Sequence, residues 1–199
     1  MATLVLNNSE IGVLDKHFTT TLQNLQRLHD KTPQAVVHLL AGALPFRALL
    51  HLRQMSEFSM ICHMPGNPLH IHARHVLALS PPNSQSCFLQ VRDICREYSL
   101  PHPLQLLETP LGRIKLKKIV KLKILEYWHQ KFSTDCSPPN LTSVKYLDPR
   151  KCSLLTPHPV WTSAGGSSYE SNKSLVVAKM ISGRYRTESL CRFWSSNTA

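Results

Sequence analysis

The chain has 199 residues, 42% of them hydrophobic, and its 23 lysines and arginines outnumber 12 acidic residues, which gives a net charge of +11 at pH 7. The length allows one domain or two small ones, and the hydrophobic content excludes a wholly disordered chain. The positive charge favours a polyanionic partner, with nucleic acid ahead of an anionic membrane surface. A solvated basic surface without a partner is the alternative.

The positive charge is concentrated in the second part of the chain. Residues 1–80 contain six basic and four acidic side chains, a net of +2, whereas residues 81–199 contain seventeen and eight, a net of +9. The two parts are therefore expected to do different jobs, and the second part is the better candidate for contact with a polyanion.

Apolar residues at spacings of three and four predict four helices in the first eighty residues, joined by tight turns as a bundle. Proline fits the first turn of a helix and glycine the residue after its end, so these residues mark the boundaries. Thr32 is the expected cap of the second helix. The first helix is expected over residues 10–29, and the next three begin at Pro33, Pro45 and Pro68 and end at Gly42, Pro65 and Pro81. Further helical segments are expected over residues 84–99 and 104–108.

A run of 22 residues without a turn residue follows, LGRIKLKKIVKLKILEYWHQKF. Its partial alternation of apolar and basic residues is a strand signal, but its length favours a helix. Lysines so close together repel one another, and phosphates would supply the missing counter-charge. The run therefore predicts a nucleic-acid-binding helix, with a solvated helix face as the alternative. Its candidate binding residues are Arg113, Lys115, Lys117, Lys118, Lys121 and Lys123.

Residues 134–167 hold five prolines, two glycines and many serines and threonines. This composition predicts a long irregular connection between two better-ordered parts. The expected organisation is a helical body over residues 1–133, this connection, and a short basic helical unit over residues 168–199. In the last unit a helix is expected from Tyr169 to Ser182, stopped by Gly183. The predicted fold class is mainly α.

Arginines and aromatic residues crowd together near the end of the chain, in GRYRTESLCRFW. Arginine beside stackable rings is typical of proteins that bind unpaired bases or distorted duplexes. Packing of the aromatic residues on the preceding helix is the alternative, and both can hold at once. The candidate binding residues of this segment are Arg184, Tyr185, Arg186, Arg192 and Trp194.

The sequence shows none of the motifs that carry catalysis. It has no GxSxG and no Walker A motif, and its carboxylates are not spaced as a metal-binding pair. The histidines of CHMPGNPLHIHARH lack a nearby carboxylate to orient them, which favours a polar helix face over a metal site. The six cysteines form no CxxC and predict thiols that are buried or incidental. We expect no enzyme activity, cofactor, bound metal or small-molecule substrate.

The N-terminus MATLVLNNSE has neither a basic region nor an apolar run long enough for a signal peptide. No apolar stretch approaches the length of a membrane span. We therefore expect an intracellular protein, nuclear or cytoplasmic, that does not associate with a membrane.

Four segments stand out in chain order: LVLNNSEIGVLDKHFTTTLQNLQRLHDKTPQAVVHLLAGALPFRALLHLRQMSEFSMI, VRDICREYSLPHPLQLLETP, HPVWTSAGGSSYE and AKMISGRYRTESLCRFWS. Together they resemble the region after the polymerase domain in proteins of animal non-LTR (LINE-type) retrotransposons, and the resemblance covers nearly the whole chain. It implies a helical, thumb-like and linker region that grips template and primer. The catalytic aspartates of that family lie before this region, and its Cys/His zinc cluster begins after the stretch that resembles GRYRTESLCRFW. The resemblance thus carries over no catalytic or metal residue, Cys191 included.

These observations predict a non-catalytic, nucleic-acid-binding fragment of a retrotransposon-encoded reverse transcriptase, with RNA or an RNA/DNA hybrid as its partner. A helical protein-interaction module is the first alternative, because residues 1–80 carry a net charge of only +2 and could present an apolar groove. An inert fragment of a decayed element is the second alternative. The oligomeric state stays open.

Overall fold

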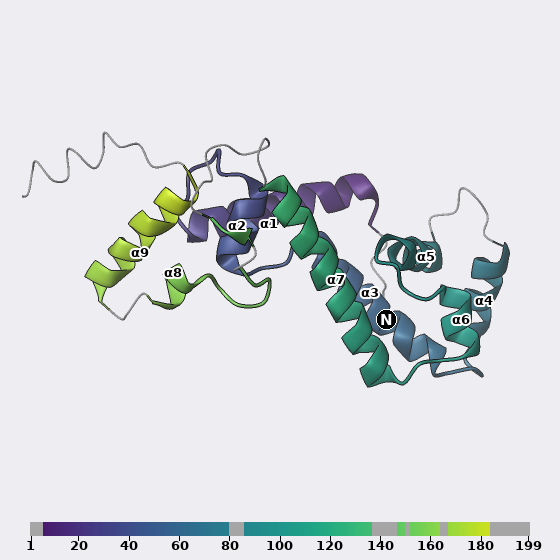
Figure 1. The fold of residues 1–199 in the computed structure, drawn as a ribbon. Coiled ribbons are helices and arrows are strands. Elements are labelled where there is room, and N and C mark those ends of the chain that lie inside the picture. Colours follow the sequence, from purple (N-terminus) through teal and green to yellow (C-terminus); the bar gives the residue numbers. More distant parts are fainter. Residues whose placement is uncertain (1–5, 80–85, 137–146, 150–151, 164–166, 184–199) are drawn as a thin grey trace, which may run out of the picture. The chain divides into compact units, whose positions relative to one another are not determined.

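The structure is a computed structural model that describes residues 6–79, 86–136, 147–149, 152–163 and 167–183. In this part of the chain the fold is mainly α-helical and has no strand, which confirms the predicted fold class (Figure 1). Its helices are α1 (Asn8–Leu25), α2 (Gln34–Ala41), α3 (Phe46–Cys62), α4 (Pro68–Leu79), α5 (Cys87–Glu97), α6 (Pro103–Glu108), α7 (Arg113–Asp135), α8 (Pro159–Thr162) and α9 (Ser168–Ile181).

Most helix ends lie where the sequence has proline, glycine or a capping side chain. Gly42 ends α2 with a φ of 64°, which glycine adopts without strain. Asn67 caps α4, because its Oδ1 accepts a hydrogen bond of 2.9 Å from the N–H of Leu69. The expectation that Thr32 caps α2 is wrong. Pro33 has an extended ψ of 139° and takes the N-cap position, with no side-chain hydrogen bond at this end.

The chain forms two compact units that are not consecutive in sequence. Unit 1 consists of Met1–Asp15 and Pro45–Trp128, and unit 2 of Lys16–Leu44 and His129–Ala199. Helices α1 and α7 contribute residues to both units, α2 belongs to unit 2, and α3 to α6 belong to unit 1. The domain boundaries expected from composition, after residues 133 and 167, stay a prediction.

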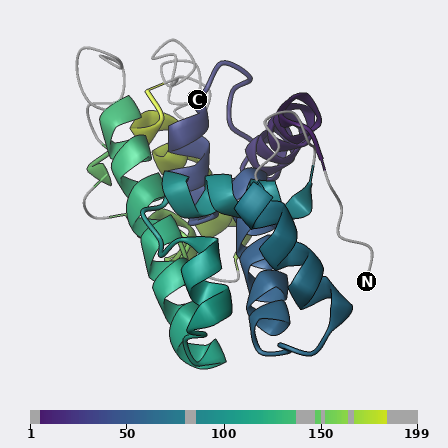
Figure 2. The ribbon, with the colours of Figure 1, turned by 90° about the vertical axis from the view of Figure 1, so that its right-hand side faces the viewer.

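Unit 1 is built around α3, which packs against α4, α5 and α6, while α4 in turn contacts α5 and α6. Figure 2 faces this unit and shows its helices lying against one another. Its core is apolar, and Phe58, Met55 and Leu106 are among the largest fully buried side chains. The basic run forms one helix, α7, as predicted, and it buries Leu116, Val120, Ile124 and Trp128 at spacings of four residues.

Unit 1 contains two linked, buried hydrogen bonds between side chains, called the buried polar chain below. The indole Nε1–H of Trp128 donates to the Tyr98 hydroxyl over 3.1 Å, and that hydroxyl lies 2.9 Å from Nδ1 of His51. Since the indole only donates, the Tyr98 proton is available to Nδ1, which places the His51 proton on Nε2. Burial, with a smaller effect of the Arg47 charge, lowers the pKa of His51 to about 4. His51 is therefore neutral at pH 7 and acts as a hydrogen-bond acceptor.

Unit 2 surrounds the imidazole of His38, which is fully buried. Its Nδ1–H donates to the Ala43 carbonyl over 3.0 Å, so its Nε2 accepts a hydrogen bond of 3.1 Å from the Thr19 hydroxyl. The ring stacks on Phe132 with the centroids 5.4 Å apart. A polar residue in the middle of the apolar stretch of α2 is thus satisfied on both nitrogens, as a buried histidine requires.

The described part of residues 134–167 is anchored within unit 2. The N–H of His158 donates to the Leu40 carbonyl over 3.0 Å, and Nε2 of His129 lies 3.1 Å from the carbonyls of both Pro149 and Cys152. This segment contains α8, which packs on α9. Helix α9 begins and ends within one residue of its predicted first and last residues, Tyr169 and Ser182. Gly183 follows the helix closely and has a φ of 70°.

Candidate nucleic-acid interface

Six of the predicted binding residues lie on the exposed surface of α7. Only Lys123 has an acidic partner within the described residues, since its Nζ lies 3.0 Å from a carboxylate oxygen of Glu126. For the other five, the part of the chain that the structure describes contains no ion pair. The six residues are Arg113, Lys115, Lys117, Lys118, Lys121 and Lys123.

The narrow buried stripe of α7 explains why so many cations are exposed. Between Arg113 and Lys123 this stripe consists of Leu116 and Val120, with Ile119 half-buried beside them, which leaves the other positions of this part of α7 facing solvent. Basic residues occupy most of those positions, together with Ile114 and Leu122, which are 79% and 58% exposed. The exposed surface of α7 is therefore both cationic and partly apolar.

Three of the cations form one row along the helix. Arg113, Lys117 and Lys121 are spaced by four residues, and each like-charged pair at this spacing costs about 0.2–0.5 kcal/mol. The row extends over about 12 Å, because the rise is about 1.5 Å per residue. A nucleic-acid strand carries one phosphate per about 3.4 Å of duplex axis, so the row can face about three or four phosphates. Phosphate binding would replace this repulsion by attraction.

Helices α3 and α7 enclose a groove of about 320 Å³ in unit 1, called the α3–α7 groove below. The three cations of the row line it on the α7 side, and none of its lining residues is acidic. Its walls are otherwise mostly apolar and include Leu52, Met55, Leu116 and Val120. Ser59 also lines the groove, is only 7% exposed, and has no hydrogen-bond partner for its hydroxyl within the described residues.

The sequence did not indicate that α3 contributes to this site. Ser59 and Met55 lie four residues apart on the buried face of a helix whose charged residues are elsewhere. The one available signal was a serine among apolar residues on that face. Such a serine more often bonds back to the helix backbone, so it identifies no site by itself.

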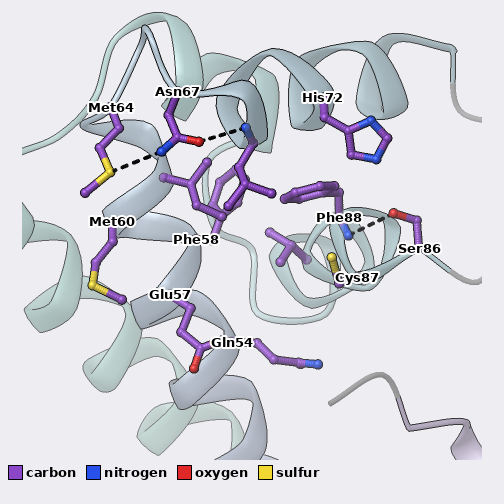
Figure 3. A pocket seen from close by; sticks show the side chains of 13 residues that line it. Gln54, Glu57, Phe58, Met60, Met64, Asn67, His72, Ser86, Cys87 and Phe88 are labelled. Carbon is purple, nitrogen blue, oxygen red and sulfur yellow. Dashed lines mark hydrogen bonds between the residues drawn. The ribbon is translucent and has the colours of Figure 1, made fainter. Parts of the chain in front are cut away.

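A second cavity of unit 1, the apolar pocket, lies among α3, α4 and α5 and measures about 440 Å³. Figure 3 shows Phe58, Met60 and Phe88 in its walls. The polar groups around it are already engaged: Gln54 donates to Gln90 over 3.0 Å, and Glu57 pairs with an arginine. The pocket therefore offers mainly apolar surface and few free hydrogen-bonding groups.

The histidines around α4 do not come together in a metal site. His70 is buried, whereas His72 is exposed and lies edge-on to Phe88 with the ring centroids 5.8 Å apart. Over the described residues, no group of three or more histidine, cysteine or acidic side chains could hold a metal ion.

The five cysteines that the structure describes are free, and all except Cys87 are buried, which confirms the predicted thiols for this part of the chain. Burial raises the pKa of Cys62 and Cys95 to about 12. These two thiols are therefore protonated at neutral pH and are poor nucleophiles. Cys191 lies outside the described residues.

The second predicted binding segment lies outside the described residues, which end at Gly183. It comprises Arg184, Tyr185, Arg186, Arg192 and Trp194, and these residues stay a prediction.

Within the described residues no single helix is long and apolar enough to cross a membrane. Helices α2 and α3 together have the required length and apolar composition, but they form a bent pair. Comparison with family models, curated proteins and solved structures finds no match to this chain.

Proposed function

We propose that this chain binds nucleic acid through the exposed cations of α7. The observation that carries the proposal is that five of six neighbouring cations, between Arg113 and Lys123, have no acidic partner in the described structure. Repulsion among such neighbouring cations destabilises the helix, and a bound polyanion would reduce this repulsion. Release of condensed counterions from the nucleic acid would then drive binding.

The proposed parent is a reverse transcriptase of a non-LTR retrotransposon, of which this chain is a non-catalytic part. The sequence landmarks support this origin, and the helical fold is compatible with a thumb and linker region. Its partner is then RNA or an RNA/DNA hybrid, held while a polymerase domain extends the primer. The place of action is intracellular, nuclear or cytoplasmic, where such nucleic acids occur.

The test is fluorescence anisotropy of the full chain with labelled single-stranded RNA, hairpin RNA and duplex DNA, each at several salt concentrations. If five cations each neutralise one phosphate, log K should fall with log salt at a slope of about −3 to −4 on a single strand. Reversing Lys117, Lys118 and Lys121 to glutamate should abolish binding. Three lysines of unit 2 provide the matched control, because their reversal changes the net charge equally away from α7: Lys16, Lys31 and Lys173.

Two outcomes of this experiment would refute the proposal. Binding that is absent in a folded wild-type sample would show that the charge is a solvated surface. Equal loss of affinity in the two triple variants would show that the net charge of the chain matters and that α7 is not the contact. A circular-dichroism melt of each variant separates loss of binding from loss of the fold.

The apolar pocket favours a second candidate function, a helical protein-interaction module. Its volume of about 440 Å³ and its walls of methionine and phenylalanine suit apolar side chains of a partner helix. Self-association measured by sedimentation at several concentrations tests this candidate. Replacing Met64, which lines this pocket and not the α3–α7 groove, by lysine should abolish association if the pocket mediates it, and should change nothing if association occurs elsewhere.

A further inference from the structure

The α3–α7 groove combines apolar walls, a row of cations and a buried hydroxyl. Its volume of about 320 Å³ lies within the range of about 300–1,000 Å³ typical of small-ligand sites. Leu52 and Met55 on α3 face Val120 on α7 across apolar surface, while Arg113 and Lys121 line the same cavity. An occupant that suits this cavity needs an apolar body joined to negative charge.

The hydroxyl of Ser59 indicates which further chemical group an occupant of the groove must carry. The side chain is 93% buried, and its oxygen has no partner within the described residues. Buried polar groups are nearly always hydrogen-bonded, and one left without a partner is destabilising. A serine hydroxyl both donates and accepts, so it can pair with either kind of polar atom on an occupant. The occupant therefore carries a hydrogen-bonding group beside its apolar surface.

An unpaired nucleobase meets these requirements. Its flat faces are apolar enough to pack between aliphatic side chains, its edge carries donors and acceptors, and a phosphate is attached on either side. An acyl chain of an anionic lipid would fill the apolar walls but has no group for the Ser59 hydroxyl. The bases of a duplex are stacked and paired, and so cannot enter a groove of this kind without being flipped out.

We infer that the α3–α7 groove receives one unpaired base of a bound strand whose phosphates lie along Arg113, Lys117 and Lys121. The inference rests on the nucleic-acid binding proposed above and adds a preference for single strands. Ser59 then contacts the base edge, and the cations hold the flanking phosphates. The groove thereby distinguishes a strand with accessible bases from a backbone of the same charge.

The experiment compares two labelled single strands of equal length, oligothymidine and the corresponding oligomer with an abasic sugar at every position. Anisotropy with the full wild-type chain should show tighter binding of oligothymidine by at least about three- to tenfold, the effect of one hydrogen bond, because packing of the base against the apolar walls adds to it. Ser59→Ala should reduce that preference by about threefold or more and leave the affinity for the abasic strand unchanged. Ser59→Thr keeps a hydroxyl and should keep the preference.

Thr32→Val is the matched control, because Thr32 carries another buried hydroxyl without a partner among the described residues, and it belongs to unit 2. It should leave both affinities unchanged. Equal affinity of the wild-type chain for the two strands would overturn the groove inference, as would a Ser59→Ala variant that keeps the whole preference. Salt-dependent binding of the abasic strand would in that case preserve the proposed function. If neither strand binds, both proposals fail.

Discussion

Acid should destabilise unit 1 through His51. The pKa of His51 is lowered from 6.5 to about 4 by burial and by Arg47. The unfolded chain therefore binds a proton near pH 6.5, whereas the folded chain resists it until about pH 4. The contribution of neutral His51 is fully present above pH 6.5 and is lost as the pH falls towards 4. A shift of about 2.5 pH units corresponds to about 3 kcal/mol of unfolding free energy.

The assay is urea unfolding at a series of pH values between 7 and 4, for the wild-type chain and for His51→Asn. The asparagine side chain still offers an oxygen to the Tyr98 hydroxyl but has no proton to gain in this range. The difference in unfolding free energy between the two proteins should shrink by about 3 kcal/mol on acidification, because only the wild-type chain loses this contribution.

Val91→Ala serves as the control for this measurement, because Val91 is a buried residue of unit 1 with no titratable group. Its destabilisation relative to the wild-type chain should not change with pH. Parallel curves for the wild-type chain and His51→Asn across the whole range would contradict this prediction, since they would mean that His51 takes up its proton equally in the folded and unfolded states.

Three further substitutions test single features of the fold. Gly42→Ala should destabilise unit 2 by more than about 2 kcal/mol in thermal or urea unfolding, because φ is 64° and a Cβ would lie 2.1 Å from the Thr156 carbonyl oxygen. Gly12→Ala should instead stabilise α1 by about 0.5–1 kcal/mol, since a Cβ there meets no atom within 4 Å. Tyr98→Phe should cost about 2–4 kcal/mol, because it removes the partner of His51 Nδ1 and the acceptor of the Trp128 indole. An unchanged midpoint in Tyr98→Phe would contradict the buried polar chain.

The sequence was sufficient to predict the longer helices and several of their ends, but not the short helix α8 inside residues 134–167. Proline has a fixed φ and no N–H, and glycine tolerates positive φ, so both residues act locally and can be read without knowledge of the fold. Gly42 ends α2 in the left-handed region, as expected, whereas Pro45, which was expected to begin α3, is its N-cap, so that α3 begins at Phe46. The wrong prediction that Thr32 caps α2 also has a local cause. The backbone of Pro33 is extended, so that α2 begins one residue later than expected.

The cationic character of α7 also follows from composition, because residues 113–131 contain seven basic side chains and a single acidic one, Glu126. Which residues share a unit and a cavity, in contrast, depends on the tertiary structure. Ser59 and Lys117 are 58 positions apart in the chain yet line the same groove, and His51 meets Tyr98 and Trp128 within one core. Such contacts depend on how apolar faces from distant segments pack together, and no local spacing of residues records that choice.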